Sequence, residues 1–94
     1  MVIGLLTVEM HLPGARSLKD KRTVLRSVKD RVKKFNVAVS ETAHHDLWQR
    51  AELGIVTIST ADDAVERELA AVRSEIDRVE PGLITRTHVD LMEA

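Results

Sequence analysis

The sequence of 94 residues contains no cysteine and no tyrosine, and its only aromatic residues are one tryptophan and one phenylalanine. The absence of cysteine excludes disulfides, thiolate metal sites and thiol catalysis. No apolar run reaches the roughly 20 residues that a membrane-spanning helix needs. Because the first nine residues also lack the basic start of a secretory signal peptide, we expect a cytoplasmic protein.

Motifs for catalysis are missing as well. The sequence has no glycine-rich phosphate loop, no Ser-His-Asp arrangement and no metal-binding motif. We therefore expect a protein that is not an enzyme and needs no cofactor. The single Asn, the single Gln and the excess of Arg over Lys, nine to five, favour a thermophilic source.

Four segments alternate between apolar and polar side chains, as is typical of β-strands. They are residues 2–12, 37–44, 51–59 and 83–92. The even positions of the first segment are wholly apolar, so we expect them to face the core. The third segment is apolar on both faces, which is typical of an interior strand. The connection before it, around residues 46–50, is expected to be an extended hairpin tip.

Two segments have the periodicity of helices that lie on a sheet, residues 17–35 and residues 60–80. We expect Ser17 and Thr60 to cap their N-termini. Asn36 is expected to end the first helix in a left-handed conformation, and a Pro-Gly pair at 81–82 to end the second.

The resulting order, β-α-β-β-α-β, predicts an α+β protein with a ferredoxin-like fold over residues 1–94. The expected structure is a single domain with a four-stranded antiparallel sheet. Its strand order would be 4-1-3-2, with both helices on one face. This order places the first and third strands in the middle, in agreement with their apolar patterns.

Three histidines, His11, His44 and His88, are expected on the sheet face away from the helices, which raises the question of a metal site. We interpret strand 37–44 as running opposite to strand 2–12, so that His11 and His44 lie at opposite ends of the sheet. Strands of about nine residues at ~3.3 Å each would hold them too far apart to share an ion. No metal site is predicted. On the same face, Glu9, Asp90 and Arg86 are expected to form cross-strand ion pairs.

Positive charge is concentrated in one part of the chain. Residues 14–36 hold nine of the fourteen Lys and Arg residues and two acids, and thus carry +7, whereas the whole chain carries −1. On a helix, five of these cations form a stripe beside the apolar stripe. We call them the basic stripe: Lys19, Arg22, Arg26, Lys29 and Lys33.

Lys21 falls in the middle of the apolar stripe of the same helix. One interpretation is a first-turn lysine whose aliphatic part packs while its amine reaches solvent. The alternative is a lysine held at a small-ligand site near the helix start.

This charge distribution favours RNA binding over the other functions considered. A sheet with two helices behind it can stack bases on aromatic residues of its central strands, but the central strands here have none. The remaining mode of RNA binding is salt-dependent contact with the phosphates of structured RNA. We predict that the basic stripe makes these contacts together with Arg16, Lys21 and Arg50. A solvated surface without a ligand is the plain alternative.

A second hypothesis places the function on the open face of the sheet. The face is expected to expose aliphatic residues such as Ile3, Leu5 and Ile84, and exposed apolar patches are often interfaces. Together with Trp48 in the hairpin, this face would serve a protein-interaction module or a two-fold homodimer.

Three stretches of the sequence resemble the YlxP-like family of small bacterial proteins of unknown function. They are residues 17–31 (SLKDKRTVLRSVKDR), 35–41 (FNVAVSE) and 46–54 (DLWQRAELG). The resemblance implies a ferredoxin-like fold. Because members are often encoded beside genes for translation initiation and ribosome maturation, it also implies a role near ribosomal RNA, with a ribosomal precursor as the partner. It brings no catalytic residues with it.

Overall fold

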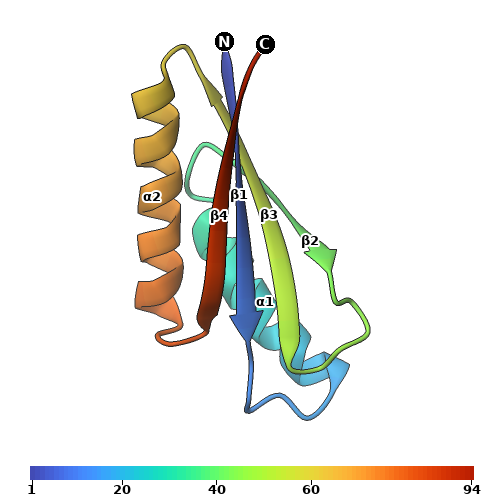
Figure 1. Cartoon of the computed structure of the whole chain (residues 1–94). Coiled ribbons are helices and arrows are strands. Elements are labelled where there is room, and N and C mark those ends of the chain that lie inside the picture. Colours follow the sequence, from blue (N-terminus) through green and yellow to red (C-terminus); the bar gives the residue numbers. More distant parts are fainter.

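The computed structural model describes all 94 residues and contains four strands and two helices in the predicted order (Figure 1). The elements are β1 (Val2–His11), α1 (Leu18–Val32), β2 (Ala38–Ala43), β3 (Arg50–Ser59), α2 (Asp62–Val79) and β4 (Ile84–Glu93). Neither helix is both long enough and apolar enough to cross a membrane.

The strands form one sheet in the order β2-β3-β1-β4, and every neighbouring pair is antiparallel. This confirms the predicted ferredoxin-like fold and its strand order. Figure 1 shows that the N-terminal end of β1 and the C-terminal end of β4 lie next to each other at one end of the sheet. Hydrogen bonds there include that of the Ala94 backbone N–H to the Met1 carbonyl at 2.8 Å.

One apolar core of sixteen buried residues lies between the helices and one face of the sheet. The even positions of β1 point into it, as predicted, and most of its odd positions are half-buried on the open face. β3 is buried at Leu53, Gly54 and Ile55 in succession, which agrees with an interior strand. The helices contribute residues three and four apart, as expected for amphipathic helices on a sheet.

The structure confirms the predicted N-cap of the first helix but not that of the second. Ser17 caps α1 as predicted, because its hydroxyl accepts the backbone N–H of Asp20 at 3.1 Å. The prediction for Thr60 is wrong: α2 begins one residue later, with Ala61 as its N-cap and no side-chain cap. The first-turn acids Asp62 and Asp63 face the positive end of the helix there.

The predicted end of α1 is also wrong. The helix ends at Val32 with Lys33 as its C-cap, and Asn36 is not left-handed. Two tertiary hydrogen bonds hold Asn36 instead. Its N–H donates to Glu68 at 3.0 Å and its carbonyl accepts the hydroxyl of Thr57 at 2.9 Å. The one non-glycine residue with positive φ is His44, at 64°.

The predicted direction of β2 relative to β1 is wrong. Both strands pair antiparallel with β3, so they run parallel to each other. Their C-terminal ends therefore lie at the same end of the sheet. His44, which follows β2, and the last residues of β1 are neighbours in space, although the predicted strand directions placed them at opposite ends of the sheet.

Candidate functional site

The basic stripe lies along α1 and its C-terminal cap. Lys19, Arg22, Arg26 and Lys33 are exposed, and Lys29 is half-buried. None of the five takes part in an ion pair. Successive members are three or four residues apart, or about 5 Å along the helix axis, so the stripe is roughly 21 Å long.

A shallow hollow of about 230 Å³ runs beside this stripe. Four stripe cations line it, from Arg22 to Lys33, together with Leu25, Asp30 and Glu41. Glu41 belongs to β2, so the hollow lies between α1 and the edge strand of the sheet. Since Lys21 neutralises Glu41, Asp30 is the one acid that opposes the four cations.

Lys21 does not belong to this surface. Its side chain is 2% exposed, and its ammonium lies 2.9 Å from Glu41 Oε2 and donates to the His44 carbonyl at 2.6 Å. The expectation that its amine reaches solvent is therefore wrong. Glu41 occupies a core-facing position of β2, opposite Leu53, and supplies the counter-charge that a buried lysine needs. Lys21 thus joins α1 to β2 and to the start of the hairpin.

Arg16 and Arg50 are not part of the basic stripe, and they lie in different parts of the molecule. Arg16 is exposed in the loop before α1, and its backbone N–H donates to Asp20 at 3.0 Å. Arg50 begins β3, and its guanidinium lies 4.0 Å from Glu9 Oε1 on the open face of the sheet. The structure therefore leaves Arg50 on the opposite side of the sheet from α1.

The open face is divided along the strands into an apolar half and a polar half. Near the two termini, Val56, Ile58 and Met92 are 37%, 53% and 53% exposed, respectively. Toward the other end, a polar hollow of about 280 Å³ is lined by Thr7, Glu9, Glu52, Arg86, Thr87 and His88. The two halves of one face thus have different chemistry.

Trp48 lies beyond the polar end of this face. It is 52% exposed and lines a hollow of about 520 Å³ with its hairpin neighbours and His11. The β1–β3 register pairs Ile3 with Ile58 and His11 with Arg50, so eight residues, or roughly 26 Å, separate the apolar half from the hairpin. Trp48 and the exposed aliphatic residues do not form one continuous patch.

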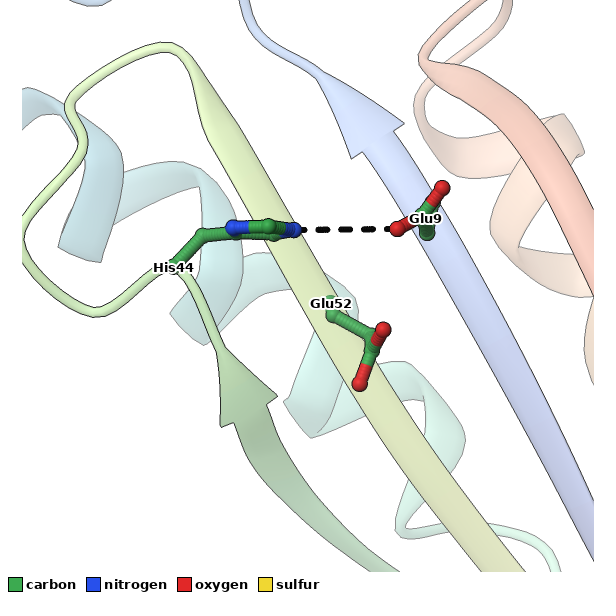
Figure 2. Close-up of side chains that lie close together, drawn as sticks. All are labelled: Glu9, His44 and Glu52. Carbon is green, nitrogen blue, oxygen red and sulfur yellow. Dashed lines mark ion pairs between the residues drawn. The ribbon is translucent and has the colours of Figure 1, made fainter.

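Three ionisable side chains meet at the polar end of the open face (Figure 2). His44 Nε2 lies 3.6 Å from Glu9 Oε1, and Glu52 lies directly opposite Glu9 on β3. Their potential ligand atoms are all within 4.8 Å of one another. The hydroxyl of Thr42 donates to Glu52 Oε1 at 2.7 Å and orients that carboxylate.

This group was not predicted from the sequence. The predicted candidates, His11, His44 and His88, do not come together, because His88 pairs with Asp90 at 3.0 Å in mid-strand. Glu52 was not among the candidate residues. The predicted strand order already implied that His44 lies near Glu9. In the order 4-1-3-2 with antiparallel neighbours, the first and second strands both pair with the third, so they run parallel to each other. The predicted ion pair of Glu9 with Arg86 does not form, although the two are register partners.

Comparison with known proteins now places the chain in a family. Residues 3–89 match the family described as "Protein of unknown function (DUF503)". The chain belongs to this family. It is also 42% identical over 77 residues to the uncharacterized protein YlxP of Bacillus subtilis strain 168, a match that covers 81% of this chain and 84% of the relative. The resemblance seen in the sequence is thereby confirmed.

Solved structures with a similar arrangement show the fold alone. A de novo designed protein with a ferredoxin fold has a TM-score of 0.55 at 13% identity, covering 100% of this chain and 87% of that chain. SnoaB, a cofactor-independent oxygenase from Streptomyces nogalater, has a TM-score of 0.52 at 15% identity, covering 99% and 92%. The group thus includes a designed protein and an enzyme, so the fold does not select a function.

Proposed function

We propose that the protein is a non-enzymatic, cytoplasmic binding protein that contacts the phosphates of structured RNA, with a ribosomal precursor as the partner. The basic stripe makes these contacts, with Arg16 at the start of the helix. The observation that supports this proposal is the presence of five cations along one side of α1 that no acidic side chain pairs with. Lysine and arginine in such an array bind phosphates by releasing counterions.

The arrangement of the stripe also supports recognition of shape rather than sequence. The cations are about one helical turn apart, four of them border a shallow hollow, and no aromatic side chain lines that hollow. Such a surface can follow a folded RNA backbone and makes no stacking contact with unpaired bases. Lys21 is not part of this proposal, because its ammonium is buried against Glu41.

Filter binding of ribosomal RNA across a salt series tests the proposal. If the five stripe cations contact phosphates, affinity should fall about five-hundredfold between roughly 50 and 200 mM salt. The double variant R22E/R26E should bind at least about tenfold more weakly at low salt.

The matched control is R31E/K34E, which makes the same change in net charge with two exposed cations away from the stripe. Circular dichroism should show that both variants remain folded. An equal loss of affinity in the two variants would show that only net charge matters. If R22E/R26E binds with unchanged affinity, the basic stripe is not the RNA-binding surface.

We propose self-association through the apolar half of the open face as a second candidate function. The exposure of Ile58 and Met92, each 53%, supports it, because aliphatic side chains so exposed on a sheet are often covered by a partner. This surface lies on the opposite face of the sheet from the helices. The two proposals can therefore be tested separately.

A further inference from the structure

The polar end of the open face carries a group of side chains that the RNA-binding proposal does not use. Glu9 comes from β1, Glu52 from β3, and His44 from the residue that follows β2. Figure 2 shows the imidazole of His44 extending across β3 toward Glu9, with the carboxylate of Glu52 beside it. Three segments that are distant in the sequence thus supply one imidazole and two carboxylates to one place.

The two carboxylates repel each other, and a bound cation would offset this repulsion. Glu9 and Glu52 are direct cross-strand partners, and like charges in such a pair destabilise a sheet. The Glu9 side chain is 27% exposed, so water screens its charge only in part. Arg50 approaches Glu9 at 4.0 Å, at the outer limit of an ion pair. No lysine or arginine is paired with Glu52.

The backbone holds His44 in an uncommon conformation at this site. Its φ of 64° lies in the left-handed region, which non-glycine residues rarely adopt. The buried ammonium of Lys21 donates to its carbonyl at 2.6 Å and so fixes the peptide from the helix side of the sheet. Lys21 thereby acts as a positioning residue for His44, and Thr42 has the same role for Glu52.

The distances fit a metal ion with small side-chain movements. Two ligands of a tetrahedral Zn²⁺ ion, each about 2.1 Å from the metal, lie roughly 3.4 Å apart. The separation of His44 Nε2 from Glu9 Oε1 is 3.6 Å. The third ligand atom, on Glu52, lies within 4.8 Å of the other two, so a small movement of this side chain would bring it to the same spacing.

We propose that Glu9, His44 and Glu52 bind one divalent transition-metal ion, with Zn²⁺ preferred over Mg²⁺. An imidazole ligand favours Zn²⁺ and related ions, whereas Mg²⁺ prefers oxygen ligands alone in octahedral geometry. Three protein ligands leave at least one coordination position open. The adjacent polar hollow, which Glu9 and Glu52 themselves help to line, leaves room for water or an anionic ligand at that position.

Isothermal titration of the full chain with Zn²⁺ tests the site. We expect one ion per chain, no comparable binding of Mg²⁺, and an affinity at least about tenfold lower in each of H44N and E52Q. Asparagine suits position 44 because it tolerates a left-handed backbone, so the loop can keep its path. E52Q keeps the oxygen that accepts from Thr42.

The matched control is H45N, since His45 is the next residue in the chain, lines no part of the polar hollow, and its ring contacts the Glu41 carbonyl instead of Glu9 or Glu52. This variant should bind Zn²⁺ as the wild type does. In nuclear magnetic resonance spectra, addition of Mn²⁺ should broaden the signals of residues 9, 44 and 52 before those of residues 88 and 90.

Three results would overturn the proposal. They are no uptake of Zn²⁺ at millimolar concentration, an affinity that H44N and E52Q leave unchanged, or an equal loss in H45N. The first would identify the group as an ordinary Glu–His ion pair. Because the site lies on the other face of the sheet from the basic stripe, R22E/R26E should bind Zn²⁺ normally, so failure of one proposal is distinguishable from failure of the other.

Discussion

At the scale of single residues, Lys21 shows how this protein accommodates a charge inside an apolar stripe. Its side chain is buried on the core face of α1, and its ammonium is the sole polar partner of Glu41 Oε2. A buried ion pair of this kind contributes little net stability, but removal of one partner leaves an uncompensated charge. The second bond of Lys21, to the His44 carbonyl, extends its influence to the open face.

We predict that K21M lowers the free energy of unfolding by about 3 kcal/mol, because it leaves the buried Oε2 atom of Glu41 without its ion-pair partner. The double variant K21M/E41M should recover most of this loss, since it removes both charges. Urea denaturation of the two variants and of E41M gives the coupling energy. A K21M variant as stable as the wild type would show that water satisfies Glu41 without Lys21.

At the scale of elements, the start of each helix is stabilised differently. Ser17 satisfies a free N–H of α1 directly, whereas α2 has no side-chain cap and relies on first-turn acids. Contacts between elements depend on small residues. A Cβ at Gly4 of β1 would lie 2.2 Å from Val65 Cγ1 and 3.0 Å from Leu69 Cδ1 of α2. The absence of a side chain at Gly4 therefore allows α2 to approach the sheet.

We expect S17A to lower the free energy of unfolding by about 1 kcal/mol, because the Asp20 N–H loses its acceptor. T60A is the control. Since Thr60 caps nothing, its replacement should change stability by less than about 0.5 kcal/mol. Thermal unfolding of both variants measures the difference. An equal effect of the two substitutions would contradict the assigned cap.

G4A should destabilise the protein by about 1–3 kcal/mol, because the buried, β-branched Val65 has little freedom to move away. G14A adds the same methyl group where no atom lies within 4 Å and should not destabilise the protein. Chemical denaturation compares the two. A neutral G4A variant would mean that α2 shifts on the sheet at little energetic cost.

At the scale of the whole molecule, three surfaces with different chemistry occupy separate places on the two sides of the sheet. The basic stripe lies on the helix side, and the apolar and polar halves of the open face occupy the other side. The proposed sites for RNA, for a second chain and for a metal ion therefore do not overlap.

For self-association, we predict that I58E shifts the protein toward the monomer in sedimentation velocity experiments, because it places a charge in the apolar half of the open face. A71E is the control, since it adds the same charge at an exposed position of α2. RNA affinity should be nearly the same in both variants. A wild-type protein that is monomeric at all concentrations tested would contradict this second candidate function.

The sequence by itself determined the elements, their order and the basic stripe. Period-two and period-3.6 patterns follow from the geometry of single strands and helices, so β1, α1 and the cap at Ser17 are readable locally. With six elements in this order, the handedness of the connections leaves few topologies, and the ferredoxin-like sheet was predictable. The positions of the stripe cations on α1 followed from the same helical geometry.

Only the tertiary structure decided which side chains meet. The partner of Lys21, the hydrogen bonds that hold Asn36, and the group of Glu9, His44 and Glu52 each join residues from separate elements. Such meetings depend on strand direction, register and the path of the hairpin, which no local pattern specifies. The left-handed backbone of His44 is the clearest case, because the ammonium that holds its carbonyl belongs to a residue 23 positions earlier in the chain.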